Sequence, residues 1–78
     1  MHLEIISPDK KIFDGDVKSV TLPGTEGSFG VLNKHASMIS SLKKGVIKVI
    51  DNAQQTQTFE IKGGVAEINN NKVIVLAE

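Results

Sequence analysis

The sequence has very few of the residues from which chemical sites are usually built. Its 78 residues include no cysteine, no tryptophan and no tyrosine, and only three phenylalanines. Without cysteine there is no disulfide framework, no thiolate nucleophile and no cysteine-based metal site. The scarcity of aromatic rings also leaves little surface on which a base or a sugar ring would stack.

Neither sign of charge dominates, and no long hydrophobic run is present. Nine Lys and Arg residues balance nine Asp and Glu residues, which is not the footprint of a nucleic-acid or anionic-membrane partner. The apolar runs are far shorter than the roughly 20 residues that a membrane-spanning helix requires, and the N-terminus lacks the pattern of a signal peptide. We therefore expect no nucleic-acid partner and no direct membrane insertion. If the protein works at a membrane, another protein holds it there.

The residues that are abundant favour β-structure. Isoleucine and valine dominate the apolar positions, and β-branched side chains prefer strands to helices. Turn signals recur at intervals of roughly 8–10 residues, which is typical of a sandwich or barrel. We predict one all-β domain over residues 1–78, a flattened β-sandwich or barrel of about eight to ten short strands. The predicted strands are 2–7, 11–13, 17–22, 35–42, 45–50, 54–61, 65–68 and 72–76.

Three local features make this prediction more specific. Asp14-Gly15-Asp16 is predicted to be a hairpin turn, because Asp-Gly is a strong hairpin signal. The inward–outward pattern slips at Val17, which indicates a bulge there. Residues 45–50 would place apolar side chains on both faces of a strand, which predicts a strand buried between two sheets.

The most distinctive stretch runs from Leu22 to Ala36. Pro23-Gly24 is a turn signal, and Gly27 and Gly30 bracket Phe29. Glycine within a strand usually marks a bulge, a bend or the close approach of another backbone. One interpretation is a hairpin with Phe29 in the core, and the other is a contact loop for a partner.

This stretch resembles the signature of the epsilon subunit of F-type ATP synthases. The motif is Leu-Pro-Gly-Thr-Glu-Gly-Ser-Phe-Gly-Val-Leu over residues 22–32, followed by His35-Ala36. Residues 3–8, 13–15, 63–68 and 73–77 also resemble the opening strand, the Phe-x-Gly turn and the closing strands of that family. Prolines of the family are replaced by Asn33, Ser37 and Lys44, so the turns that contain them have lost a stiffening residue.

The resemblance implies a non-catalytic central-stalk subunit that couples the gamma shaft to the membrane c-ring. It places the protein at the cytoplasmic face of the bacterial inner membrane, as a peripheral part of the complex. The predicted c-ring contacts are Glu26, Gly27, Ser28, Phe29 and Gly30, and the predicted gamma contacts are Ser7, His35 and Ser40. Most family members continue into a C-terminal helical hairpin. The sequence ends at Glu78, so either the protein is a natural short form or the hairpin has been removed from the sequence. The absence of linker composition favours the natural short form.

No residue pattern indicates catalysis, a cofactor or a metal. Glu26 and His35 resemble an acid–base pair only by residue type, because no nucleophile motif accompanies them. His2 and His35 do not stand in a spaced set of metal-ligand residues. Residues 24–30 lack the strand–loop–helix context of a phosphate-binding loop. Two alternatives remain open: a small-ligand or carbohydrate-binding β-module, which lacks an aromatic platform, and a small enzyme, which lacks a convergent polar constellation.

Overall fold

The computed structural model describes residues 1–32 and 34–78, except for the side chain of His35. Every regular element in these residues is a β-strand, so the predicted all-β fold is confirmed. The eight strands are β1 (His2–Ile6), β2 (Lys11–Gly24), β3 (Gly27–Val31), β4 (His35–Leu42), β5 (Gly45–Asp51), β6 (Thr56–Ile61), β7 (Gly64–Asn70) and β8 (Lys72–Ala77).

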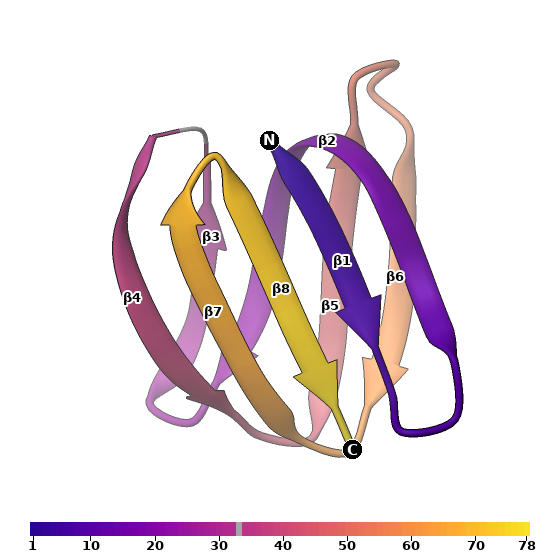
Figure 1. Ribbon diagram of the computed structural model, residues 1–78, viewed down its shortest axis with the longest axis vertical. Helices are drawn as coiled ribbons and strands as arrows, with labels where there is room; N and C mark the ends of the chain where they lie inside the picture. Colours follow the sequence, from indigo (N-terminus) through magenta and orange to yellow (C-terminus); the bar gives the residue numbers. More distant parts are fainter. Residues whose placement is uncertain (33) are drawn as a thin grey trace.

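The strands form a two-layered sandwich in which β2 belongs to both layers (Figure 1). In the front layer the first half of β2 pairs with β1, followed by β8, β7 and β4. In the back layer the second half of β2 pairs with β3 on one side and β5 on the other, and β6 follows β5. The layers also meet where Gly24 at the end of β2 pairs with Leu42 at the end of β4.

The predicted hairpin turn at Asp14-Gly15-Asp16 is wrong, because β2 continues through these residues without a turn. Their backbone pairs with β1, with Leu3 opposite Gly15 and Glu4 opposite Asp14. The local turn signal is therefore outweighed by long-range pairing. The predicted bulge is confirmed, since the register between β2 and β5 shifts between Val17 and Ser19. A glycine followed by a bulge lets one strand bend from the front layer into the back layer.

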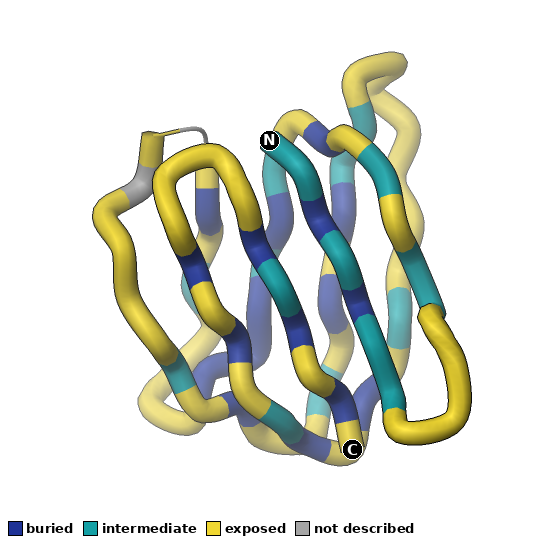
Figure 2. Tube along the Cα trace, in the orientation of Figure 1, coloured by how far each residue is buried: buried dark blue, intermediate teal, exposed yellow. Residues whose placement is uncertain are grey.

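The core between the layers is aliphatic, and buried positions alternate with exposed ones along most strands (Figure 2). No polar or charged residue is buried among those described. The phenylalanines lie at the margins of the core. The rings of Phe13 and Phe59 meet edge to face, with 5.5 Å between their centroids. The fully buried side chains are Leu3, Ile5, Val17, Val20, Leu22, Val31, Ile47, Val49, Ala66, Ile68, Val73 and Val75. Burial of each larger aliphatic side chain stabilises the fold by about 1.5–3 kcal/mol.

The expectation that residues 45–50 are buried on both faces is wrong. Ile47 and Val49 point into the core, but Val46 is 47% exposed and Lys48 is also exposed. Strand β5 lies within one sheet of the sandwich, so its other face meets solvent. The apolar residue at position 46 therefore belongs to the surface.

One end of the sandwich, which we call the base, gathers the connections 7–10, 24–27, 42–45 and 61–64 and the C-terminus (Figure 1). Backbone hydrogen bonds tie these connections together. Thr25 N–H donates to the Ser41 carbonyl at 3.0 Å, and Lys43 N–H donates to the Pro23 carbonyl at 2.9 Å. The β2–β3 turn is thus fixed to the end of β4, which positions the loop described next.

Candidate functional site

The glycine-rich stretch forms a tight hairpin at the base. Gly24 pairs with Gly27, and only Thr25 and Glu26 lie between them. Across the hairpin, Leu22 pairs with Phe29 and Pro23 with Ser28. The predicted hairpin is therefore confirmed, but Phe29 does not lie in the core: it is half-buried and packs against the core cluster.

The hairpin presents most of its residues to solvent. Glu26, Gly27, Ser28 and Gly30 are exposed. The carboxylate of Glu26 stands at the tip and the hydroxyl of Ser28 follows on the returning strand, while Phe29 packs beneath. Hairpin and contact loop are thus compatible: one aromatic anchor holds a turn whose polar groups face outward.

Two glycines in this hairpin are required by its geometry. A Cβ on Gly24 would lie 2.7 Å from the Gly27 carbonyl oxygen and 2.9 Å from the Phe29 ring. Gly27 has a φ of +132°, a backbone conformation that side chains other than glycine's rarely adopt. The motif residues therefore have a conformational role at the turn, and the contact surface is built on that conformation.

The hairpin lies beside β4. A hollow of about 310 Å³ is lined by residues 24–29 together with Met38 and Ser40. The structure thus brings the predicted c-ring loop next to Ser40, one of the predicted gamma contacts. The backbone of His35 lies further along β4, opposite Asn70. The side chain of His35 is outside the described residues, and so is the suggested Glu26–His35 pair.

The outer face of the front layer carries a group of exposed aliphatic side chains that we call the outer apolar strip. Ile39 is 72% exposed, Leu76 55% and Val65 40%. They lie side by side because β4, β7 and β8 are adjacent, with Val65 opposite Leu76 and Glu67 between Ile39 and Ile74. These residues line a shallow groove of about 210 Å³. The outer apolar strip consists of Ile39, Val65, Ile74 and Leu76, and Glu67 also lines the groove.

Of the two serines predicted to contact gamma, Ser7 borders this strip on the β1 side, whereas Ser40 points away from it. Ser7 directly follows Ile6, which pairs with Leu76, and its hydroxyl donates to the Lys10 carbonyl at 3.1 Å. Ser40 follows Ile39 on β4 but points to the opposite face, because it pairs with the buried Ala66 while Ile39 pairs with the exposed Glu67. The two serines do not touch, because β7 and β8 separate their strands. The strip was not predicted from the sequence. Residues 73–76 are all apolar, however, and this pattern indicates that both faces of the strand carry apolar side chains.

A second group of polar side chains lies on β1 and β2, near the edge of the same outer face. His2 Nε2 is 2.7 Å from Asp14 Oδ1, and Lys11 Nζ donates to Asp14 Oδ2 at 3.0 Å. The hydrogen bond from Lys11 lowers the pKa of the Asp14 carboxyl, and the same bond raises the pKa of Lys11. Lys11 also lies 3.5 Å from Glu4.

We expected His2 to stand in no set of metal-ligand residues, and this expectation is wrong. Single ligand atoms of His2, Glu4 and Asp14 all lie within 4.8 Å of one another. The sequence signal was the i, i+2 spacing of His2 with Glu4 and of Asp14 with Asp16. That signal was lost because residues 14–16 were interpreted as a turn.

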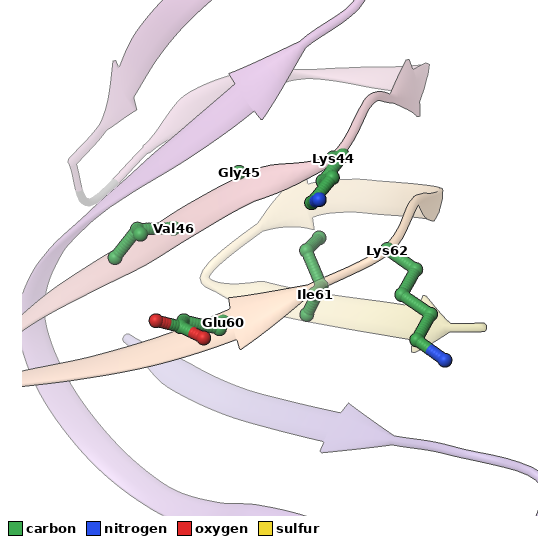
Figure 3. A pocket seen from close by; sticks show the side chains of 6 residues that line it. All are labelled: Lys44, Gly45, Val46, Glu60, Ile61 and Lys62. Atoms are coloured by element: carbon green, nitrogen blue, oxygen red, sulfur yellow. The ribbon is translucent and has the colours of Figure 1, made fainter.

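A third hollow, of about 400 Å³, lies at the base end of β5 and β6 (Figure 3). It is lined by Lys44, Gly45, Val46, Glu60, Ile61 and Lys62. In Figure 3 the two lysine side chains extend in different directions instead of converging on one point. No aromatic residue lines the hollow, so it offers little support for a carbohydrate-binding module.

No helix in the described part of the chain could cross a membrane. The fold with its exposed base hairpin and outer apolar strip defines a small β-sandwich module that offers binding surfaces. A family model described as the β-sandwich domain of the ATP synthase delta/epsilon chain matches residues 1–78. The chain therefore belongs to this family.

Curated relatives match along the whole chain. The ATP synthase epsilon chain of Campylobacter concisus (strain 13826) is 49% identical over 78 residues, which are all of this chain and 60% of the relative. The ATP synthase epsilon chain of Maricaulis maris (strain MCS10) is 44% identical over 78 residues, or 58% of that relative. The chain thus spans about 60% of the length of the curated relatives it matches.

Solved structures share the fold. A chain in the cryo-EM structure of the Euglena gracilis mitochondrial ATP synthase, OSCP/F1/c-ring, superposes with a TM-score of 0.91 at 26% identity. The match covers 96% of this chain and 48% of that one. A chain from the central stalk/c-ring structure of the Tetrahymena thermophila mitochondrial ATP synthase superposes at 0.79 with 21% identity, covering 99% of this chain and 62% of that one. The second match concerns the fold alone.

Proposed function

We propose that the protein is a non-catalytic central-stalk subunit of a rotary, proton-translocating F-type ATP synthase, and that it couples the gamma shaft to the membrane c-ring. The supporting observation is that a small sandwich of the ATP synthase delta/epsilon chain family exposes two separate surfaces. These surfaces are the base hairpin and the outer apolar strip. Close-packed protein interiors resist compression. A small, densely packed sandwich therefore suits a part that transmits torque between two partners.

In this proposal the outer apolar strip meets gamma. Aliphatic side chains gathered on one exposed face mark an interaction surface more often than isolated ones do. Ile39 is the most exposed member of the strip at 72%. Of the predicted gamma contacts that the structure describes in full, Ser7 lies at the β1 border of the strip, whereas Ser40 follows Ile39 on β4 but points to the opposite face of that strand. The Ser7 hydroxyl would form part of a polar rim beside the aliphatic side chains, which is the usual anatomy of an interface.

The base hairpin would be the foot on the c-ring. The Glu26 carboxylate at the turn offers two acceptor oxygens to a cationic or amide group of the ring loops. Gly27 and Gly30 carry no side chains, so a partner backbone can approach closely. Because the contact is exposed, each charge-assisted bond would contribute only about 1 kcal/mol. The protein would then sit peripherally at the cytoplasmic face of the bacterial inner membrane, held there by its partners.

Gamma binding tests the proposal. Ile39→Asp would remove the most exposed aliphatic side chain of the strip and add a second carboxylate beside Glu67, so we expect affinity for purified gamma to fall by about tenfold or more. Val46→Asp is the matched control: Val46 is 47% exposed, but it lies on the outer face of the back layer. This control should bind gamma like the unmodified protein. The proposal fails if the unmodified protein does not bind gamma, and the assignment of the strip fails if both variants bind equally well.

A further inference from the structure

The polar group on β1 and β2 is arranged like a metal centre. His2 and Glu4 are two residues apart on β1, and Asp14 and Asp16 are two residues apart on β2. Residues two apart in a strand point to the same face. In the antiparallel pairing, His2 lies opposite Asp16 and Glu4 opposite Asp14. One imidazole and three carboxylates therefore form a square on one surface of two paired strands.

The distances within the square suit one small cation. One ligand atom from each of His2, Glu4 and Asp14 lies within 4.8 Å of the other two. With metal–ligand bonds of about 2.0–2.1 Å, the ligand atoms of a tetrahedral zinc site are about 3.3 Å apart. His2 Nε2 and Asp14 Oδ1 are now in contact at 2.7 Å. A small separation of these two side chains, without a change in the strands, would admit the ion between them.

The surrounding groups orient the ligands as they do around known metals. The second nitrogen of His2, Nδ1, faces Asp16 Oδ1 at 3.5 Å, which leaves Nε2 to face Asp14. Metal-ligating histidines almost always direct their other nitrogen at a carboxylate, a carbonyl or a water. Lys11 contacts Oδ2 of Asp14 and not Oδ1, so it holds the carboxylate by one oxygen while His2 contacts the other.

Two lysines near Glu4 limit the affinity of the cluster for a divalent metal ion. Lys11 lies 3.5 Å from one oxygen of Glu4 and Lys72 lies 3.7 Å from the other. Both distances are longer than a hydrogen bond, so Glu4 is held by loose ion pairs that a dication can replace. The nearby ammonium charges oppose a dication, which favours a borderline metal that forms strong bonds to imidazole over Mg²⁺ or Ca²⁺.

We propose that His2, Glu4 and Asp14 bind one Zn²⁺ ion, with Asp16 orienting the imidazole and a water as the fourth ligand. The ion would bridge β1 and β2 at the point where β2 crosses from the front layer to the back. Its expected effect is to stabilise that strand pair. The inference does not depend on the role in a central stalk.

Titration of the purified protein with Zn²⁺ by calorimetry tests this proposal. We expect saturable binding of one ion per chain, a rise in the melting temperature that EDTA reverses, and no such rise with Mg²⁺. His2→Ala and Asp14→Asn should each weaken zinc binding by more than about tenfold. His35→Ala, which removes the other of the two histidines, is the control and should leave binding unchanged.

The ring nitrogens of His2 report the site directly. On zinc addition, the ¹⁵N resonance of Nε2 should shift far more than that of Nδ1. The proposal is overturned if binding does not saturate, if His2→Ala binds zinc as tightly as the unmodified protein, or if His35→Ala abolishes binding. A His2 spectrum that zinc does not change would also overturn it, and the cluster would then be an ion-pair network only.

Discussion

Gly24 and Gly27 face each other across the base hairpin so closely that a Cβ on Gly24 would lie 2.7 Å from the carbonyl oxygen of Gly27. The turn between them carries Glu26, the charged group of the proposed foot. The position of that carboxylate thus depends on a glycine that has no chemical role of its own.

Gly24→Ala should destabilise the protein by about 1–3 kcal/mol, because the added methyl group meets backbone and the Phe29 ring. Gly30→Ala is the matched control from the same motif: a Cβ there meets nothing within 4 Å. Urea unfolding of both variants measures the difference. Equal stabilities would contradict the close contact at Gly24.

Phe29→Ala should also lower stability, near the lower end of the about 3–5 kcal/mol typical of buried phenylalanines, because the ring is only half-buried. Phe29→Leu should recover much of the loss, since it keeps an apolar group against the core. The free energies of unfolding of the two variants provide the measurement. If Phe29→Ala is as stable as the unmodified protein, the ring does not anchor the hairpin.

The Lys11–Asp14 pair predicts a pH dependence of stability in metal-free buffer. The folded-state pKa of Asp14 is below 3.8, so its contribution is present above that value and is lost as the pH falls through the lowered pKa. The folded-state pKa of Lys11 is above 10.5, so its contribution is present below that value and is lost as the pH rises through the raised pKa.

Comparison of the unmodified protein with Asp14→Asn isolates the acid limb of this dependence. Their stability difference should be present above about pH 3.8 and shrink as the pH falls below that value. Unfolding measured with EDTA present at several pH values provides the comparison. A difference that grows on acidification would mean that the carboxylate of Asp14 is not stabilised by Lys11 in the folded state.

The strands and the central hairpin were largely predictable because their signals are local. Turn residues ended the strands, and Pro23-Gly24 marked the hairpin. The prediction failed at Asp14-Gly15-Asp16, where pairing with β1 outweighs the local turn preference. It failed again at Val46, because a residue's face is set by which layer its strand joins.

The surfaces were less predictable than the strands. The outer apolar strip brings Ile39 and Leu76 onto one surface because β4, β7 and β8 are adjacent. The order of strands in a sheet cannot be inferred from local sequence patterns. The cluster of His2 with Asp14 arises in the same way, from the pairing of β1 with β2. The c-ring and gamma contact residues came from family resemblance, and they remain predictions.

Coupling of proton pumping to ATP hydrolysis tests the central claim most directly. Complexes reconstituted with the unmodified protein, with Glu26→Ala plus Ser28→Ala, or with Val46→Asp as a surface control would be compared for both activities. We predict that the double variant retains hydrolysis but pumps less, because the foot loosens from the ring, while the control pumps normally. If the double variant pumps and binds the ring like the unmodified protein, the base hairpin is not the coupling contact.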